Sequence, residues 1–309
     1  MVRTLRLLAP CVLAAVLGTA ALSAQNPAGE RRTALLIDAV ALDSKNMPIS
    51  DLKASDVEVW IGHFRVPIET LTPVTPATDD RGGRIVVLVL DDISVPLAMI
   101  GHVKDVAKRF VTRMAPGDTM AIMLLSQGEM QSTNDSSKLL RTIDRYNVTA
   151  APVTRLDVLG EQVLKTVTSI SRSLSEAGDQ RKTIVAIGSG WLLDRPLPPP
   201  SVGRELIPEW IEAMKAASRA NVNYYVIDPT GVGNVQADSG HNGFARETGG
   251  QAFISTNDLL GSADRIMRES ANYYLIGVGN PPVGGTGLRE LEVKSLRRGV
   301  TVRARRAIH

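Results

Sequence analysis

Three residues have the side-chain types of a nucleophilic hydrolase: Ser189, Asp228 and His241. In such an enzyme the serine attacks, the histidine takes its proton and the aspartate orients the histidine. The spacing gives this triad no support, because each glycine of Gly188–Gly190 stands one residue closer to the serine than in the Gly-x-Ser-x-Gly turn that presents a serine nucleophile. A solvated loop histidine is the competing interpretation of His241. We therefore expect no enzyme, and a hydrolase is the alternative hypothesis.

Carboxylate and hydroxyl side chains are the other groups of this chain that could do chemistry, as metal ligands. The one cysteine, Cys11, lies in the N-terminal apolar segment. Cysteine catalysis, cysteine-ligated zinc and disulfides are therefore excluded for the rest of the sequence. A metal ion bound there would be held by carboxylate and hydroxyl oxygens, which suit Mg²⁺.

Three loop-like stretches follow apolar strands, and these stretches are Asp91–Pro96, Ser189–Pro200 and Asp228–Gly243. In an open parallel sheet, ligands bind where the carboxyl ends of the strands meet. Trp191, Asp194 and Asp228 are therefore our candidates for contact with a protein partner, since an exposed tryptophan is a common interface anchor. Packing of Trp191 against the domain's own loops is the alternative.

Strand–helix alternation after residue 84 predicts the elements that position these loops. Ile85–Leu90 is a continuous apolar run, typical of a strand that is buried on both faces of a parallel sheet. The pattern predicts an α/β domain with a doubly wound, mostly parallel sheet. Further strands are expected at Met120–Leu125, Thr183–Ile187, Asn221–Ile227 and Gln251–Ile254, with an edge partner at Glu129–Thr133. Helices are expected at Met99–Met114, Ser136–Tyr146, Leu156–Leu174 and Pro208–Arg219, and after the capping-box pattern Ser255–Asp258.

Strands flank this domain on both sides in the sequence. They are expected at Thr33–Leu42, Val57–Ile61, Val66–Leu71, Tyr273–Val278, Leu288–Ser295 and Val300–Arg306. Because the C-terminal strands lack partners of their own, we expect them to pair with the N-terminal ones in a discontinuous β-module. The predicted division is a signal peptide at 1–24, an N-terminal β-strand segment at 25–80, the α/β domain at 81–272 and C-terminal β-strands at 273–309.

Several motifs together resemble a von Willebrand factor type A (VWA) domain. They are a buried strand that ends in Asp91–Ser94, the turn Pro116–Asp118 before Met120–Met123, and Ala220–Pro229. More narrowly, the chain resembles the bacterial secreted "VWFA-related" family common in acidobacteria. The segments similar to that family are Leu52–Val59, Glu247–Phe253, Tyr273–Gly277 and Val300–Arg306. The resemblance covers essentially the whole chain after residue 24.

The resemblance implies a metal-ion-dependent adhesion site that ends the first strand of the sheet. In the family, an Asp-x-Ser-x-Ser motif helps to hold Mg²⁺, and one coordination position stays open for a carboxylate of the partner. When the motif is aligned on Asp92, it keeps Asp92 and Ser94 but has Pro96 in place of the second serine. When it is aligned on Asp91, apolar residues occupy both hydroxyl positions.

The two remaining ligands that the resemblance implies come from later loops. Thr154 fits the threonine position, whereas Ser189 stands where the family has an aspartate. The site is therefore degenerate, and we expect Mg²⁺ to bind weakly at most. In the alternative interpretation, Asp91 and Asp92 only cap the sheet edge and the N-terminus of the helix that follows.

The N-terminal segment Met1–Ala24 has the pattern of a secretory signal. Arg3 and Arg6 precede the apolar run Leu7–Leu17, and small residues precede Gln25. We predict cleavage after Ala24, and an uncleaved membrane anchor is the alternative. No later apolar run approaches the roughly 18 residues that span a bilayer.

Composition excludes several classes of protein. With 44% hydrophobic residues and a net charge of +3, the chain is not intrinsically disordered. Loss of the two arginines in the signal nearly balances basic and acidic residues, so we expect no nucleic-acid partner. The prediction is a secreted or periplasmic protein-interaction module that binds a partner at the carboxyl edge of its sheet.

Overall fold

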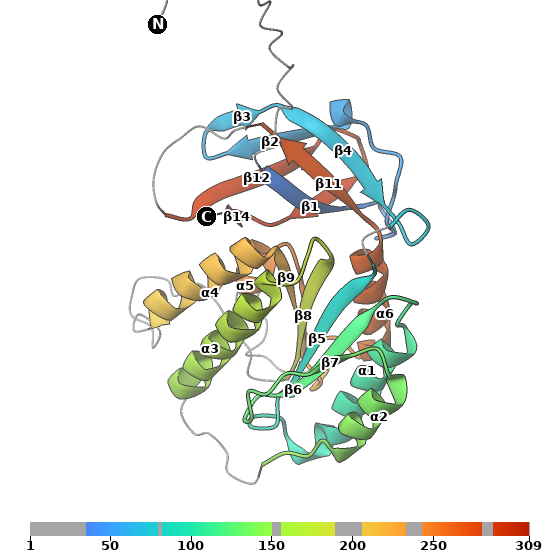
Figure 1. The fold of residues 1–309 in the computed structure, drawn as a ribbon, viewed down its shortest axis with the longest axis vertical. Helices are drawn as coiled ribbons and strands as arrows, with labels where there is room; N and C mark the ends of the chain where they lie inside the picture. The colour runs from blue at the N-terminus through green and yellow to red at the C-terminus, as the bar shows by residue number, and fades with distance from the viewer. Residues whose placement is uncertain are drawn as a thin grey trace, which may run out of the picture. The chain divides into compact units, whose positions relative to one another are not determined.

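A six-stranded sheet forms the centre of the α/β domain (Figure 1). The computed structural model describes residues 35–79, 82–149, 156–188, 206–232, 243–279 and 287–308, with only the backbone at 156–158. Within them the strand order is β10-β9-β8-β5-β6-β7, parallel except for β7 at one edge. These strands are β5 (Arg84–Leu90), β6 (Thr119–Leu124), β7 (Ser132–Thr133), β8 (Arg181–Ile187), β9 (Val222–Ile227) and β10 (Ala252–Phe253). This doubly wound order reverses between β5 and β8, and it confirms the predicted fold class.

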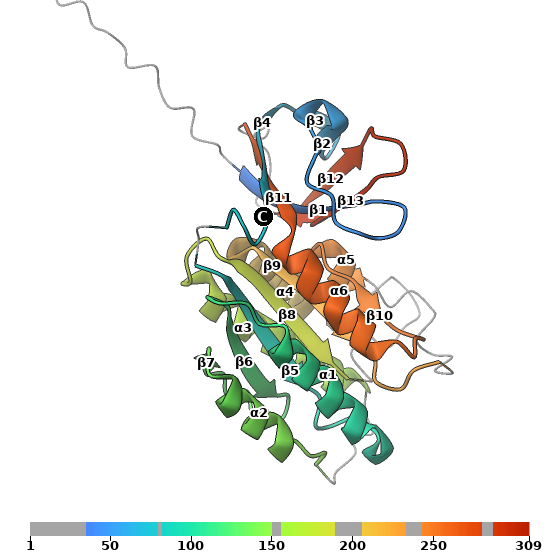
Figure 2. The ribbon, with the colours of Figure 1, turned by 90° about the vertical axis from the view of Figure 1, so that its right-hand side faces the viewer.

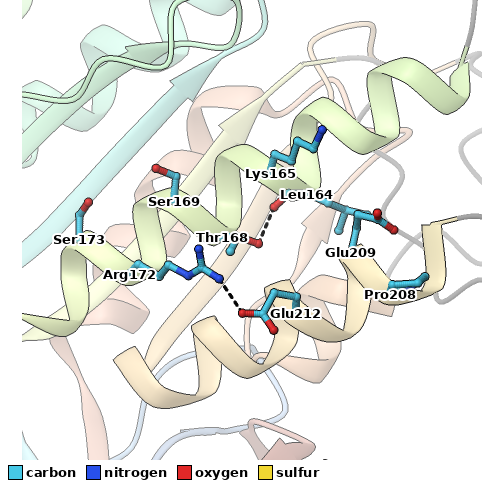
Figure 3. Close-up of a pocket in the computed structure, with 9 residues that line it drawn as sticks. All are labelled: Leu164, Lys165, Thr168, Ser169, Arg172, Ser173, Pro208, Glu209 and Glu212. Carbon is cyan, nitrogen blue, oxygen red and sulfur yellow. Dashed lines mark hydrogen bonds and ion pairs between the residues drawn. The ribbon is translucent and has the colours of Figure 1, made fainter.

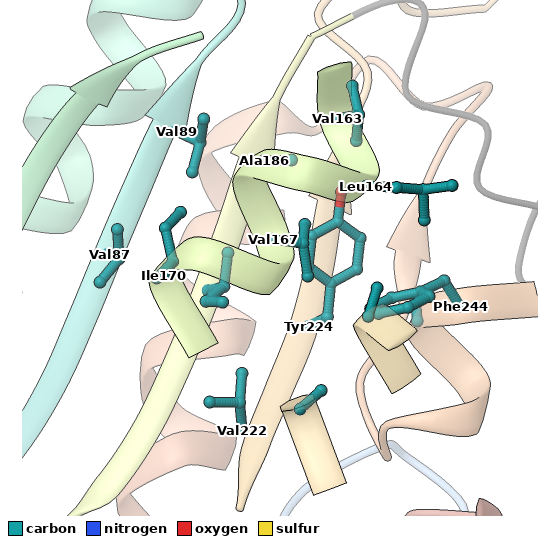
Figure 4. Packing of buried hydrophobic residues seen from close by; sticks show 14 of the residues in the cluster. Val87, Val89, Val163, Leu164, Val167, Ile170, Ala186, Val222, Tyr224 and Phe244 are labelled. Carbon is teal, nitrogen blue, oxygen red and sulfur yellow. The ribbon is translucent and has the colours of Figure 1, made fainter. Parts of the chain in front are cut away.

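Helices cover both faces of this sheet (Figure 2). One face carries α3 (Leu156–Ser175), α4 (Ile207–Ala220) and α5 (Gly243–Glu247), and the other carries α1 (Ile100–Thr112), α2 (Ser136–Arg145) and α6 (Leu259–Ala271). Because side chains alternate along a strand, β5 sends Val87 and Val89 into the first core (Figure 4) and Val86, Leu88 and Leu90 into the second. Every residue of β5 is therefore buried, which explains the unbroken apolar sequence Ile85–Leu90 after Arg84.

Helix caps follow the sequence closely, with one difference. Asp135 caps α2 by accepting a hydrogen bond from the Lys138 amide at 3.1 Å. At α6 the cap is Asp258, which accepts from the Gly261 amide at 3.0 Å, and the predicted capping box does not form. Ser255 instead has a left-handed backbone, with φ of 51°, so the chain turns before the helix begins.

The flanking strands form two antiparallel four-stranded sheets. One has the order β13-β1-β11-β4 and the other β14-β12-β2-β3. Strand β1 pairs with both β11 and β13, and β2 pairs with β12, which confirms that the C-terminal strands pair with the N-terminal ones. The strands are β1 (Leu35–Leu42), β2 (Val57–Ile61), β3 (Phe64–Val66), β4 (Ile68–Val74), β11 (Tyr273–Val278), β12 (Arg289–Ser295), β13 (Thr301–Ala304) and β14 (Ala307–Ile308).

The two antiparallel sheets share one apolar core and form a β-sandwich. Its core holds side chains from both sheets, among them Ile37, Val59 and Ile276. The sandwich contacts the α/β domain at the amino ends of the parallel strands (Figure 1): Asp38 of β1 pairs with Arg181, the first residue of β8, at 2.6 Å. The carboxyl ends of those strands therefore lie at the opposite end of the sheet.

Both parts lie in one unit, Thr33–His309, and the predicted domain boundaries stay predictions. None of the helices in the described ranges has the length and apolar character needed to cross a membrane. The predicted signal segment lies outside the described residues.

Candidate functional site

Asp91 lies at the end of β5, at the carboxyl edge of the sheet, and is fully buried. Its amide donates to the Ile187 carbonyl at 3.1 Å, which holds it beside β8. Its Oδ1 accepts from the amides of Ile93 and Ser94 at 3.0 and 2.8 Å, and its Oδ2 accepts from the Ser94 hydroxyl. The carboxylate therefore folds its own loop into a tight turn.

Asp92, 1% exposed, ties β5 to the segment after β6. Its Oδ1 accepts from the Ser126 amide at 2.9 Å, and its Oδ2 accepts from the Ser126 hydroxyl. Its carbonyl accepts from the amide and the hydroxyl of Thr149 at 2.7 and 2.8 Å. The Tyr146 hydroxyl donates to the neighbouring carbonyl of Asp91 at 2.6 Å. Asp91 and Asp92 thus bind three segments of the edge: their own loop, the segment after β6 at Ser126, and the segment after α2 at Tyr146 and Thr149.

Burial and this negative charge raise the pKa of two tyrosines, Tyr146 and Tyr224. Burial, and then the charges of Asp91 and Asp92, raise the pKa of Tyr146. Burial and the charge of Asp91 also raise the pKa of Tyr224, whose hydroxyl points toward Val163 and Leu164 of α3 (Figure 4). Both phenols therefore stay protonated, and the edge combines buried carboxylates with neutral hydroxyl groups.

Asp228 ends β9 at the same edge and is 3% exposed. Its Oδ1 accepts from the amide and the hydroxyl of Thr230 at 2.9 and 2.7 Å. The following carbonyl, that of Pro229, lies 3.1 Å from Nδ1 of His102 on α1. The Val232 amide donates to Oδ1 of Asn257, in the loop before α6, at 3.2 Å. Hydrogen bonds therefore join the loop after β9 to α1 and to the loop before α6.

The structure places Asp91, Asp92, Ser94 and Asp228 at one edge. The other predicted residues, namely Thr154, Ser189, Trp191, Asp194 and His241, lie outside the described residues. The arrangement of the predicted hydrolase triad and of the complete metal-ligand set therefore stays a prediction.

Sequence reasoning missed the two residues that hold Asp92. Ser126 and Thr149 lie 34 and 57 positions away along the chain, in unremarkable polar loops. The available signal was topological, because Ser126 follows the predicted strand Met120–Leu125, which must end at the same edge as Asp92 in a parallel sheet.

The described carboxylates do not by themselves form a metal site. Within the described ranges, no group of three or more His, Cys, Asp or Glu side chains is arranged to hold a metal ion. Both oxygens of Asp91 and both of Asp92 accept protein hydrogen bonds at the sheet edge, but neither carboxylate caps the helix that follows, whose N-cap is Met99. Weak Mg²⁺ binding stays a prediction.

A separate cavity of about 550 Å³ lies between α3 and α4 (Figure 3). Arg172 and Glu212 form an ion pair across it at 2.7 Å, and Lys165 and Glu209 complete a balanced set of charges. Its lining contains none of the site residues that the sequence predicts. The balance of charges indicates no particular ligand.

Exposed apolar side chains also occur at the carboxyl edge. Leu97, in the turn Leu97–Met99 before α1, is 73% exposed, and Val232, after β9, is 66% exposed. Leu260, in the first turn of α6, is 46% exposed. Leu97 lies just before α1, Val232 in the loop after β9 and Leu260 on α6, and the hydrogen bonds of His102 and Asn257 connect the β9 loop to α1 and to the loop before α6.

No protein-family model matches this sequence, and no curated protein matches it. Solved structures similar to it include an aerotolerance-related membrane protein from Bacteroides fragilis, with 14% identity, a TM-score of 0.42 and coverage of 61% of this chain and 98% of that one. Manganese-loaded TRAP protein from Plasmodium vivax has 13% identity, a TM-score of 0.39 and coverage of 76% and 96%. Proximal thread matrix protein 1 from the mussel byssus, with a zinc-occupied MIDAS motif, has 11% identity, a TM-score of 0.41 and coverage of 68% and 50%.

The strand order of this chain's own sheet agrees with the fold that its sequence motifs imply. The α/β domain is VWA-like. In this VWA-like domain the acidic strand end is Asp91–Asp92, and its carboxylates are bound within the edge. The fold alone assigns no activity to the domain.

Proposed function

We propose that this chain is an exported protein-interaction module whose VWA-like domain binds a protein partner at the carboxyl edge of its sheet. The single observation that supports this most is the exposure of Leu97, Val232 and Leu260 in segments that hydrogen bonds connect at this edge. Contiguous exposed apolar patches mark protein-interaction sites, and in this proposal the three side chains contribute to one such patch.

The edge is also pre-organised. Because Asp92 binds Ser126 and His102 meets the carbonyl of Pro229, the loops need little ordering when a partner arrives. A surface that is already ordered loses less conformational entropy on binding, which favours affinity. The carboxylates thus contribute by shaping the edge, and a binding role is proposed rather than a catalytic one.

In this proposal the metal site is degenerate, and the partner is recognised without an obligatory Mg²⁺ ion. The engagement of the Asp91 and Asp92 oxygens within the edge supports this part of the proposal. Export is proposed from the N-terminal pattern Met1–Ala24 alone.

The test is quantitative capture from native envelope and exoproteome extracts, with wild-type protein and two variants as bait. Leu97→Asp places a charge at the edge, and we expect it to lose a partner that the wild type enriches. Phe64→Asp is the matched control, because Phe64 is 60% exposed but lies on β3 of the sandwich. Equal enrichment by both variants, or enrichment that EDTA abolishes, would contradict the proposal.

A further inference from the structure

A cluster of buried polar side chains lies where the sandwich meets the amino ends of the parallel strands. We call the set Asp38, Arg181, Thr183, Asn223 and Arg305 the junction cluster. Each of its members is at most 5% exposed. Arg181 and Thr183 project from the same face of β8, and Asn223 is the register partner of Thr183 on β9.

Arg305 joins this cluster from the C-terminal segment. Gly249 lies against both the Arg305 amide and the side-chain amide of Asn223, since a Cβ on Gly249 would fall 2.8 and 2.9 Å from them. The charges of Asp38 and Arg181 both act on the Arg305 guanidinium. Arg305 is 5% exposed, so this charge is almost completely removed from water.

The junction cluster holds six of the twelve buried side-chain atoms that lack a hydrogen-bond partner in the described part of the chain. They are Oδ1 of Asp38, Nε of Arg181, Oγ1 of Thr183, Oδ1 of Asn223, and both Nε and Nη2 of Arg305. Unsatisfied buried polar atoms are rare in folded proteins, and a group of them indicates a bound water or ion.

Charge decides between these two occupants. Nη1 of Arg181 donates to Oδ2 of Asp38 at 2.6 Å, and its guanidinium stacks 4.3 Å from the centre of the Tyr273 ring. Among the described residues, the Arg305 guanidinium donates to the Ser218 carbonyl alone, at 2.9 Å from Nη1. The charge of one carboxylate, Asp38, therefore acts on two guanidinium groups, whereas the charge of the 6% exposed Lys182 is opposed first by Asp179 and then by Asp38.

An arginine cannot relieve this surplus by losing its proton, because a guanidinium stays charged in proteins. Burial lowers the pKa of Arg305 and the charge of Arg181 adds to this effect, while Asp38 opposes it. Nε and Nη2 form the edge of a guanidinium that donates two converging hydrogen bonds to an anion. In Arg305 both atoms of this edge are without a hydrogen-bond partner among the described residues.

We propose that the junction cluster binds a small monovalent anion, chloride, between the guanidinium groups of Arg181 and Arg305. One negative charge balances the surplus of the two arginines over Asp38, and the ion accepts hydrogen bonds from the open edge of Arg305. The enclosure of the cluster favours a small ion. The site is separate from the carboxyl edge, and it joins the sandwich to the VWA-like domain.

The first test is thermal unfolding of the full chain in sodium chloride and in sodium gluconate at equal ionic strength. An ion that binds only the folded state stabilises it, and at ten times its dissociation constant Tm rises by about 3–6 °C. We expect this rise in chloride and not in gluconate. Equal Tm values in both salts would overturn the proposal and indicate bound water, and a rise in sulfate without one in chloride would overturn the monovalent assignment.

Three variants assign the effect to the cluster. Arg305→Gln should abolish the chloride response, and Asp38→Asn, which removes the competing carboxylate, should increase it. Arg298→Gln is the control, because Arg298 is an exposed arginine of the same C-terminal segment and should leave the response unchanged. A response that survives in Arg305→Gln would contradict the site.

A crystallographic measurement keeps the proposal testable if Arg305→Gln does not fold. Crystals of the wild-type protein grown in sodium bromide should give an anomalous peak within hydrogen-bond distance of Nε and Nη2 of Arg305. Density there without anomalous signal would identify water and overturn the proposal.

Discussion

Replacing Asp92 by alanine separates a structural carboxylate from a metal ligand. The Asp92 carboxylate is buried and accepts two hydrogen bonds from Ser126, one of them from the amide at 2.9 Å. Hydrogen bonds to a charged group each contribute about 1.5–3 kcal/mol, and their loss also leaves the Ser126 donors unsatisfied. We therefore expect Asp92→Ala to lower the free energy of unfolding by about 3 kcal/mol.

Denaturant titration measures this loss, and Ser126→Ala should remove about half of it because the amide bond to Asp92 remains. The double variant should then show a coupling energy on the order of 1 kcal/mol between the two side chains. Asp135→Ala is the control: it removes an exposed helix cap and should cost about 1 kcal/mol.

Calorimetry with Mg²⁺ completes the experiment, and we expect weak binding at most in the wild type. The reasoning is refuted if the wild type binds Mg²⁺ with micromolar affinity and Asp92→Ala abolishes that binding while the unfolding free energy stays within about 0.5 kcal/mol. The main role of Asp92 would then be that of a metal ligand and not that of a structural hydrogen-bond acceptor.

Three further measurements test the fold and the export prediction. Arg109 and Arg113 bind the Asp264 carboxylate and lower its pKa from 3.8 to about 2. The ionised carboxylate therefore stabilises the folded state above pH 4, and this contribution is lost as the pH falls toward 2. Asp264→Asn should lower the free energy of unfolding by about 1 kcal/mol at pH 7 and by less at pH 3, as measured by urea unfolding of the wild type and the variant. An equal loss at the two pH values would contradict this. Gly250→Ala should abolish soluble folding or cost several kcal/mol, because a Cβ there would fall 1.8 Å from the Tyr224 carbonyl oxygen; a wild-type Tm would be inconsistent with this close approach. Mass spectrometry of the exported protein should find Gln25 at its N-terminus, and an intact Met1 would instead indicate an uncleaved anchor.

The sequence predicted the elements better than their partners. The apolar run Ile85–Leu90 lies within β5, because both faces of this part of the strand pack against apolar cores. The strand Tyr273–Val278 was predicted at its observed bounds, since it begins directly after a helix. The small final strand β14 was not predicted separately, because two residues carry no periodicity.

The contacts that shape the site and the junction were beyond sequence reasoning for a physical reason. Asp38 and Arg181 are 143 positions apart, and each is an ordinary charged residue at a strand where exposure would be expected. Only the docking of the sandwich onto the start of β8 buries them together. Periodicity predicts which face of an element is apolar, but it does not predict which polar residues a later strand will cover.

Buried charged groups at the two ends of the parallel sheet differ in their hydrogen bonding, and this difference bears on function. At the carboxyl edge, the buried carboxylate of Asp91 accepts hydrogen bonds from its own loop and that of Asp92 accepts them from Ser126 after β6, whereas Leu97 is exposed. At the amino end, Arg305 is buried with an open hydrogen-bonding edge. Since a buried charge without a counter-charge is costly, we propose a counter-ion at the amino end, whereas the partner binding that we propose at the carboxyl edge needs none.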